Sequence, residues 1–181
     1  MRVVQSLALC LVLCLLLLAG WAAAQNLAKM PDIEGENLAG QKVTLPQATK
    51  GEVAVLVFGF SRASKAPTSA WADKLNSEFG ARSGFALYQL PVLEQVPRFI
   101  RGMVISGMKR NVGVSVREHF VPLLQREEEL KKLVSYKEPD DAYLVILDRG
   151  GQIVQQWHGT LTDAAYARLH GELESLLNRR E

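Results

Sequence analysis

Cysteine is almost absent from this sequence. The 181 residues include two cysteines, Cys10 and Cys14, and both lie in the apolar segment at the N-terminus. From residue 25 onward the chain has no thiol, so this part can form no disulfide and offers no thiolate for redox or nucleophilic chemistry. Net charge is also scarce, at +2 for the whole sequence. A global positive field for nucleic acid is therefore not supported, and no nucleic-acid partner is expected.

The first 24 residues have the pattern of a secretory signal peptide. Arg2 is their only charged residue, a long apolar run follows, and Ala22–Ala24 supplies small residues for cleavage before Gln25. The alternative is an uncleaved membrane anchor, because the run has about the 18 residues of a transmembrane candidate. We expect an exported protein, periplasmic or extracellular after cleavage, or anchored in the membrane.

After the signal, the sequence predicts a lead-in over residues 25–34 and one domain over residues 35–181, which is long enough for a sizeable core. Strand-like and helix-like patterns alternate along the domain. The expected elements are a hairpin around Gly40–Gln41, strands at 52–60 and 84–93, helices at 67–79 and 97–110, a helical stretch at 115–134, two strands within 142–159, and a helix at 162–179.

Local features support several of these elements. The valine-rich run at 52–60 is typical of a strand buried on both faces. Trp71, Leu75 and Phe79 fall four residues apart and share one helix face. Within 115–134, Ser115 and Glu118 have the spacing of a capping box, and Pro122 predicts a break or kink.

The order of elements predicts an α/β fold. The strands at 52–60 and 84–93 are joined through a helix and should be parallel, whereas the last two strands are joined by a tight turn at 148–151 and must be antiparallel. The expected result is a mixed sheet of four to five strands with helices on both faces and a helical insert at 97–134.

Three segments resemble the thioredoxin-like superfamily, in particular peroxiredoxins and exported thiol-disulfide proteins. They are "LAGQKVTLP", "VAVLVFGFSRASKAP" and "AYLVILDRGGQIVQQWHG". The resemblance implies a thioredoxin-like fold, and it places Ser64 and Pro67 where a thioredoxin motif has its two cysteines. The family's cis-proline position falls near Asp141 or Ala142, and the nearest proline is Pro139.

A narrower resemblance concerns the segment "FSRASKAPTSAW". It is similar to the mitochondrial ATP-synthase assembly factor of the thioredoxin-like type. That resemblance implies a chaperone for a membrane protein complex and no catalysis.

The first candidate binding site is the loop that stands where a redox centre would be. Its candidate residues lie around a helix N-terminus, which attracts anions such as a carboxylate: Arg62, Ser64, Lys65, Pro67 and Trp71. The alternative is an ordinary polar loop beside a core tryptophan.

Catalysis by this loop is not expected. A serine nucleophile needs a base within hydrogen-bond reach, and none of the three histidines, His119, His158 and His170, is placed by the sequence near Ser64. No histidine pair has metal-ligand spacing, and adjacent Asp140 and Asp141 have the pattern of a turn before a strand. We expect no metal and no cofactor.

The second candidate surface is the insert. Between residues 98 and 120 it carries five basic residues and one acidic residue, mixed with methionines that adapt to irregular partners. Such a segment suits a protein partner or a membrane surface, and the alternative is a helix packed on the sheet with its arginines reaching out to solvent. The candidate residues are Arg98, Arg101, Met103, Met108, Lys109 and Arg110.

These observations lead to three hypotheses. The first is a redox-inactive thioredoxin-like binding protein of the cell envelope, acting as a scaffold, chaperone or assembly factor for a protein partner or membrane complex. The second is an oxidoreductase-like enzyme acting on thiols, disulfides or peroxide without cysteine. The third is a decoy paralogue of such an enzyme.

Overall fold

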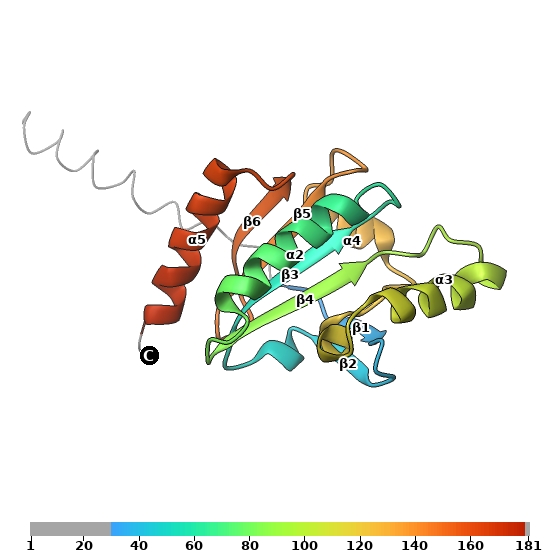
Figure 1. Ribbon diagram of the computed structural model, residues 1–181, viewed down its shortest axis with the longest axis horizontal. Coiled ribbons are helices and arrows are strands. Elements are labelled where there is room, and N and C mark those ends of the chain that lie inside the picture. Colours follow the sequence, from blue (N-terminus) through green and yellow to red (C-terminus); the bar gives the residue numbers. More distant parts are fainter. Residues whose placement is uncertain (1–29, 180–181) are drawn as a thin grey trace, which may run out of the picture.

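The computed structural model describes residues 30–179. The expected signal peptide or anchor at 1–24 lies outside the described residues. The elements follow the order β1 (Ile33–Glu36), β2 (Lys42–Leu45), η1 (Gln47–Thr49), β3 (Val53–Gly59), α2 (Lys65–Phe79), β4 (Phe85–Pro91), α3 (Arg98–Asn111), η2 (Val114–His119), α4 (Glu127–Leu133), β5 (Ala142–Leu147), β6 (Ile153–Gly159) and α5 (Asp163–Asn178) (Figure 1). No helix within 30–179 is both long and apolar enough to span a bilayer.

The main sheet has four strands in the order β4-β3-β5-β6, and β1 and β2 form a separate hairpin. β3 pairs with β4 in parallel and with β5 in antiparallel orientation, and β5 pairs with β6 in antiparallel orientation. Both predicted strand orientations are therefore confirmed. A short extended segment, residues 120–123, adds isolated parallel bridges to the outer edge of β4, at Gln89 with Phe120 and at Val92 with Leu123.

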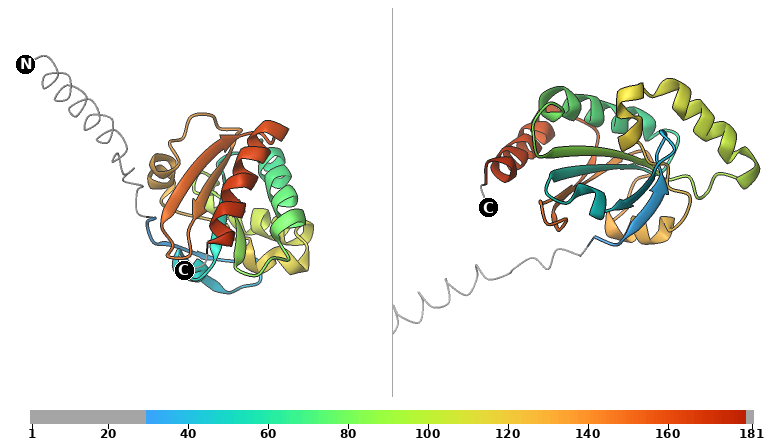
Figure 2. Two further views of the ribbon diagram at one scale, coloured as in Figure 1. Left: turned by 90° about the vertical axis from the view of Figure 1, so that its left-hand side faces the viewer. Right: turned by 90° about the horizontal axis from the view of Figure 1, so that it is seen from below.

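Two apolar clusters lie on opposite faces of the main sheet. On one face α2 and α5 pack against alternate residues of β3 and β5. On the other face the β1–β2 hairpin, segment 120–123 and α4 cover the remaining residues of the same strands. The views of Figure 2 show these layers on either side of the sheet. The predicted mixed sheet with helices on both faces is confirmed.

The apolar face predicted for α2 is confirmed, and an apolar face of α5 packs in the same cluster. Trp71, Leu75 and Phe79 are all buried in α2, and Leu169 and Leu173 face them from α5. The N-cap of α5 is Thr162, whose side chain accepts a hydrogen bond from the backbone N–H of Ala165 at 3.2 Å.

A polar network joins the outer sides of α2 and α5. Glu78 accepts hydrogen bonds from Lys74 and from the hydroxyl of Tyr166, and Arg82 pairs with Glu174. The hydrogen bonds from Lys74 and Tyr166 lower the pKa of Glu78, and the bond from Arg82 lowers the pKa of Glu174. A lowered carboxyl pKa stabilises the folded state above the unfolded pKa, and this contribution is lost as the pH falls through the folded value.

The folded part begins inside the expected lead-in. Met30 and Ile33 are buried in the core, and the boundary placed at residue 35 falls within β1. The hairpin turn is shaped by buried Asn37, whose Oδ1 accepts from the backbone N–H groups of Ala39 and Gln41. The same side chain donates to the carbonyl of Glu118 at 2.9 Å, so it also ties the hairpin to the insert.

The helical stretch expected at 115–134 is wrong. Residues 114–119 form the 3-10 helix η2, residues 120–126 are irregular or extended, and α4 begins only at Glu127. The N-cap of η2 is Gly113 and Ser115 lies inside this helix, so the predicted capping box is not formed. The predicted break at Pro122 is confirmed, and its cause goes beyond the proline ring: the N–H groups of Val121 and Leu123 on either side donate to carbonyls of β4. In this segment, hydrogen bonding to the edge of β4 is therefore favoured over helix formation.

Gly35 in β1 should resist substitution. A Cβ at this position would stand 2.5 Å from Cγ1 of buried Val121. We expect Gly35→Ala to lower the free energy of unfolding by about 1–3 kcal/mol, as overpacking does. The control is Gly171→Ala on exposed α5, where a Cβ meets nothing within 4 Å; it should stabilise by about 0.5–1 kcal/mol. Urea unfolding measures both, and equal effects would contradict the close approach of β1 to segment 120–123.

Candidate functional site

The first candidate site lies at one end of the main sheet, where β3 and β4 finish and β5 begins. Gly59, the last residue of β3, is opposite Ala142, the first residue of β5, and beside Pro91, the last residue of β4. The β3–α2 loop, residues 60–64, therefore lies next to residues 138–141, which precede β5. A hydrogen bond of 3.1 Å from the hydroxyl of Ser61 to a carboxylate oxygen of Asp140 links the two segments.

Ser64 is a structural residue of this loop. It is only 1% exposed, and its hydroxyl donates to the carbonyl of Ser61 at 2.8 Å while accepting from the Ser61 N–H at 3.3 Å. Gly59 makes room for it, because a Cβ on Gly59 would come within 2.7 Å of the Ser64 Oγ. No histidine or carboxylate contacts the Ser64 hydroxyl among the described hydrogen bonds, so nothing there would act as its base.

The start of α2 offers few free donors to an anion. Ser64 occupies the N-cap and makes no side-chain capping bond, and Thr68 donates its hydroxyl back to carbonyls of the first turn. The N–H groups of Ala63 and Ser64 donate to Ser61 Oγ, and Pro67 has no N–H. The helix dipole remains, but most of the N–H groups that would grip a carboxylate are already occupied or missing.

The predicted loop residues separate into two groups. Arg62 and Lys65 are exposed, and Pro67 is partly exposed. Trp71 is fully buried, and its Nε1 donates to the carbonyl of Gly159 at 3.0 Å. Trp71 is thus a core residue that joins α2 to the end of β6, and it is not available to a ligand.

An aromatic cluster beside the loop was missed by sequence reasoning. Phe60 packs edge-on against Tyr136 and Tyr143, with ring centroids 5.2 Å and 5.5 Å apart. Tyr143 is fully buried, and its hydroxyl accepts from two backbone N–H groups and donates to the carbonyl of Glu138, which fixes the segment before β5. The sequence signal was weak, because these aromatics come from three separate segments.

The histidines fill packing roles. His158 stacks on Tyr143 at 5.7 Å, and its Nδ1 lies 2.9 Å from Asp141 Oδ2. His119 packs edge-on against Tyr88, and His170 packs against Phe79. Within residues 30–179, no three side chains of histidine, cysteine, aspartate or glutamate lie close enough together to hold a metal ion. The site therefore offers an aromatic cluster, exposed charge and the His158–Asp141 pair.

The second candidate surface is α3 in the insert. None of its residues is buried. Arg98, Met103, Lys109 and Arg110 are exposed, with Met103 at 71%, whereas Met108 is partly covered. Arg101 is different: its guanidinium donates to the carbonyls of Val96 and Glu94, so it holds the connection from β4 to α3 in place.

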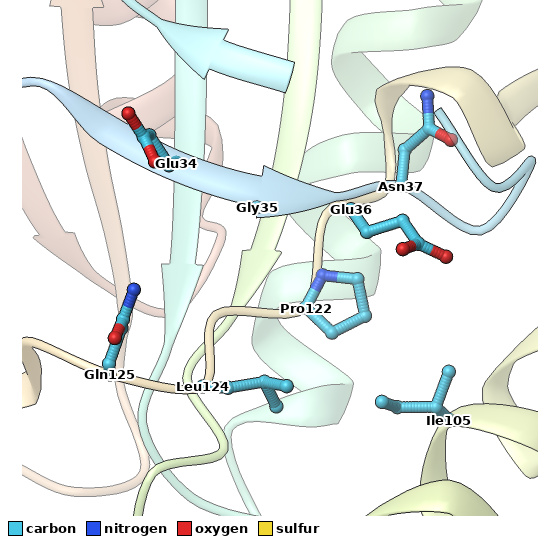
Figure 3. Close-up of a pocket in the computed structure, with 8 residues that line it drawn as sticks. All are labelled: Glu34, Gly35, Glu36, Asn37, Ile105, Pro122, Leu124 and Gln125. Atoms are coloured by element: carbon cyan, nitrogen blue, oxygen red, sulfur yellow. The ribbon is translucent and has the colours of Figure 1, made fainter. Parts of the chain in front are cut away.

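A pocket of about 280 Å³ lies between the insert and the hairpin. Figure 3 shows Ile105 of α3 pointing toward Pro122 and Leu124, while Glu34 and Glu36 of β1 lie along the other side. The pocket is open to solvent and mixes apolar and acidic groups.

The fold is that of thioredoxin-like proteins of known structure. The chain matches a putative thiol:disulfide interchange protein DsbE from Chlorobium tepidum with a TM-score of 0.56 and 18% identity, covering 83% of this chain and 96% of that one. For BsSco, a member of the Sco family of cytochrome c oxidase assembly proteins, the TM-score is 0.57 and the identity 14%, with 84% and 95% covered. For the exposed lipoprotein thioredoxin Etrx1 from Streptococcus pneumoniae the values are 0.54 and 16%, with 79% and 100% covered. No protein-family model matches the chain, and no curated protein sequence matches it significantly.

The loop should accept a disulfide if it keeps the frame of a redox centre. Ser64 has helical dihedral angles at the N-cap, so its Cα and that of Pro67 lie one turn apart, at about 5 Å, within disulfide range. We expect Ser64→Cys with Pro67→Cys, in a chain with Cys10→Ser and Cys14→Ser, to form this disulfide in glutathione buffer. Thiol titration and the loss of two mass units measure it.

The matched control for that pair is Ser64→Cys with Ala66→Cys, because residues two apart at a helix start do not face each other. This pair should need a more oxidising buffer. If both pairs oxidise at the same glutathione ratio, the loop does not hold the geometry described.

Proposed function

We propose that this thioredoxin-fold chain works by binding a protein partner in the cell envelope, as a scaffold, chaperone or assembly factor, and that it performs no redox chemistry. The observation that carries the proposal is the state of Ser64. The resemblance to thioredoxin-like proteins places Ser64 where they have a reactive cysteine. Ser64 is buried, and both hydrogen-bonding sides of its hydroxyl are used by Ser61. A buried hydroxyl with both of its hydrogen-bonding sides occupied stabilises the conformation of the loop.

The side chains that lie exposed at and beside the β3–α2 loop support the proposal. Arg62 on the β3–α2 loop and Lys65 at the start of α2 are exposed, and Phe60 in the same loop packs against Tyr136, with both rings half-buried. Aromatic and arginine side chains are the usual anchors of protein interfaces. The Ser61–Asp140 bond holds the two segments together, so little ordering is needed on binding.

Assembly is the favoured version of this role. One structural neighbour belongs to a family of cytochrome c oxidase assembly proteins, and another is an exposed lipoprotein. The signal-like segment at 1–24 agrees with export to the same compartment. The partner is then a polypeptide with acidic and apolar groups that match Arg62, Lys65 and the aromatic cluster.

The enzymatic alternative predicts turnover that the binding hypothesis does not. The full chain with Cys10→Ser and Cys14→Ser should consume peroxide and reduce a disulfide substrate no faster than buffer, because residues 25–181 contain no thiol. Ser64→Ala on the same background should leave these rates unchanged. Turnover above the blank that disappears with Ser64→Ala would overturn the binding-only proposal.

Partner capture tests the proposal directly. Tagged full-length protein, purified from its native envelope, should retain a defined partner in fixed ratio. Arg62→Glu with Lys65→Glu should abolish this by reversing the loop charge. Lys50→Glu with Lys42→Glu makes the same charge change at exposed positions that precede β3, and it should retain the partner.

Two results of that capture would count against the proposal. Equal retention by both double variants would remove the loop from the interface. Capture of a thiol oxidoreductase as the partner would favour the decoy hypothesis over assembly.

A further inference from the structure

Exposed apolar side chains are concentrated in the insert. Within residues 30–179, the large hydrophobic residues that are well exposed are Phe99, Met103, Val114 and Leu124, and all four lie between β4 and β5. Phe99 is 88% exposed and Met103 71%. Two such side chains one helical turn apart form an apolar patch that nothing in the described chain covers.

The outer face of α3 surrounds this patch with positive charge. Arg98, Lys109 and Arg110 are exposed at the two ends of the helix, and the helix sequence RFIRGMVISGMKRN contains no acidic residue. Between the ends, the exposed residues Gly102 and Ser106 are small, so no long side chain projects from this part of the face. None of the three cations makes a salt bridge within residues 30–179.

The position of the helix is set from its inner side. Arg101 holds its start by bonding the carbonyls of Val96 and Glu94. Arg117 of η2 holds its end, because its guanidinium donates to the carbonyls of Val112 and Lys109. The outer side chains take no part in these contacts. Figures 1 and 2 show α3 extending beyond the sheet, away from α5.

These features fit a lipid surface better than a protein groove. The outer face is that of a projecting helix, and the pocket beside α3 lies on its inner side, at Ile105. An aromatic and a methionine flanked by arginine and lysine are the residues by which a helix lies in the interface of an anionic bilayer. The expected export or anchoring of the chain brings it to a membrane.

We propose that the outer face of α3 rests on an anionic phospholipid surface, with Phe99 and Met103 entering the interface and Arg98, Lys109 and Arg110 facing the phosphates. This contact uses a surface separate from the partner-binding loop. It goes beyond the proposed function and does not depend on it.

A dye placed on α3 tests the contact without interference from the N-terminal segment. The full chain carries Cys10→Ser, Cys14→Ser and Ser106→Cys, and the new thiol bears an environment-sensitive fluorophore. Vesicles of phosphatidylcholine with about 30% phosphatidylglycerol should shift its emission to the blue, and about 0.5 M salt should reverse the shift. The same dye at Ser175→Cys on exposed α5 should not shift. Neutral phosphatidylcholine vesicles should give little shift at either position, whether or not the apolar N-terminal segment inserts.

Variants then assign the contact to side chains. Lys109→Gln with Arg110→Gln should weaken the vesicle affinity about 25-fold, since each cation near an anionic surface contributes about a factor of five. Phe99→Ser with Met103→Ser should abolish the blue shift. Arg62→Gln with Lys65→Gln removes the same charge from the loop and should leave the shift unchanged. Unaltered circular dichroism confirms folding, because none of these side chains makes a contact that holds α3.

Three outcomes would overturn the proposal. They are no shift at position 106 on anionic vesicles, an equal and salt-insensitive shift on neutral vesicles, and an unchanged vesicle affinity for the variant Lys109→Gln with Arg110→Gln. A shift produced by the captured partner protein and not by vesicles would identify the face as a protein interface and likewise end the lipid proposal. In each case the capture result for Arg62 and Lys65 stands on its own, so failure here is distinguishable from failure of the proposed function.

Discussion

The rest of the structure depends on the burial of β3. All seven residues from Val53 to Gly59 are buried, and both edges of the strand are paired, with β4 on one side and β5 on the other. Backbone groups buried this deeply must be hydrogen-bonded, so neither neighbour is optional. The pairing brings the end of β4 and the start of β5 to Gly59, and the N–H of Val92 donates to the Gly59 carbonyl at 2.8 Å. This strand pairing therefore places the β3–α2 loop beside the segment that precedes β5.

The same requirement explains the shape of the insert. The outer edge of β4 exposes its own backbone groups, and segment 120–123 satisfies some of them: Val121 N–H bonds Gln89, and Leu123 N–H bonds Pro91. Val121 and Leu123 then place their side chains in the core. Once the chain returns along β4 in this way, α3 is left outside the packed layers and is held by arginine contacts to backbone carbonyls, with none of its own residues buried.

Much of the fold could be predicted because its signals are local. The valine-rich run of β3, the four-residue spacing of Trp71, Leu75 and Phe79, and the turn between β5 and β6 each carry their structure in adjacent residues. The same spacing could have assigned Trp71 to the core before any site was considered. The error at 115–134 arose because the Ser115–Glu118 pattern is local, whereas the competing edge of β4 is about thirty residues away in the chain.

The candidate site was less predictable for the same reason. Arg101 looks like a solvated cation in the sequence, since nothing there indicates that two carbonyls of the preceding connection surround its guanidinium. Ser61 and Asp140 join only because β3 and β5 are neighbours. The aromatic cluster likewise requires Phe60 to meet Tyr136 and Tyr143, which lie in a distant part of the chain. The lack of a thiol in the loop could be predicted, because the absence of cysteine can be read from the sequence without knowing the structure.

The direction of the strands connects the two surfaces. β3 and β4 are parallel, so the β3–α2 loop and the connection leading to α3 leave the sheet at the same end. A chain that rests on a membrane through α3 therefore holds its β3–α2 loop close to that membrane. Arg62 and Lys65 would then face proteins embedded in the bilayer or lying on it more readily than proteins free in solution. In the proposed binding role, the chain would then select its partner by location as well as by contact.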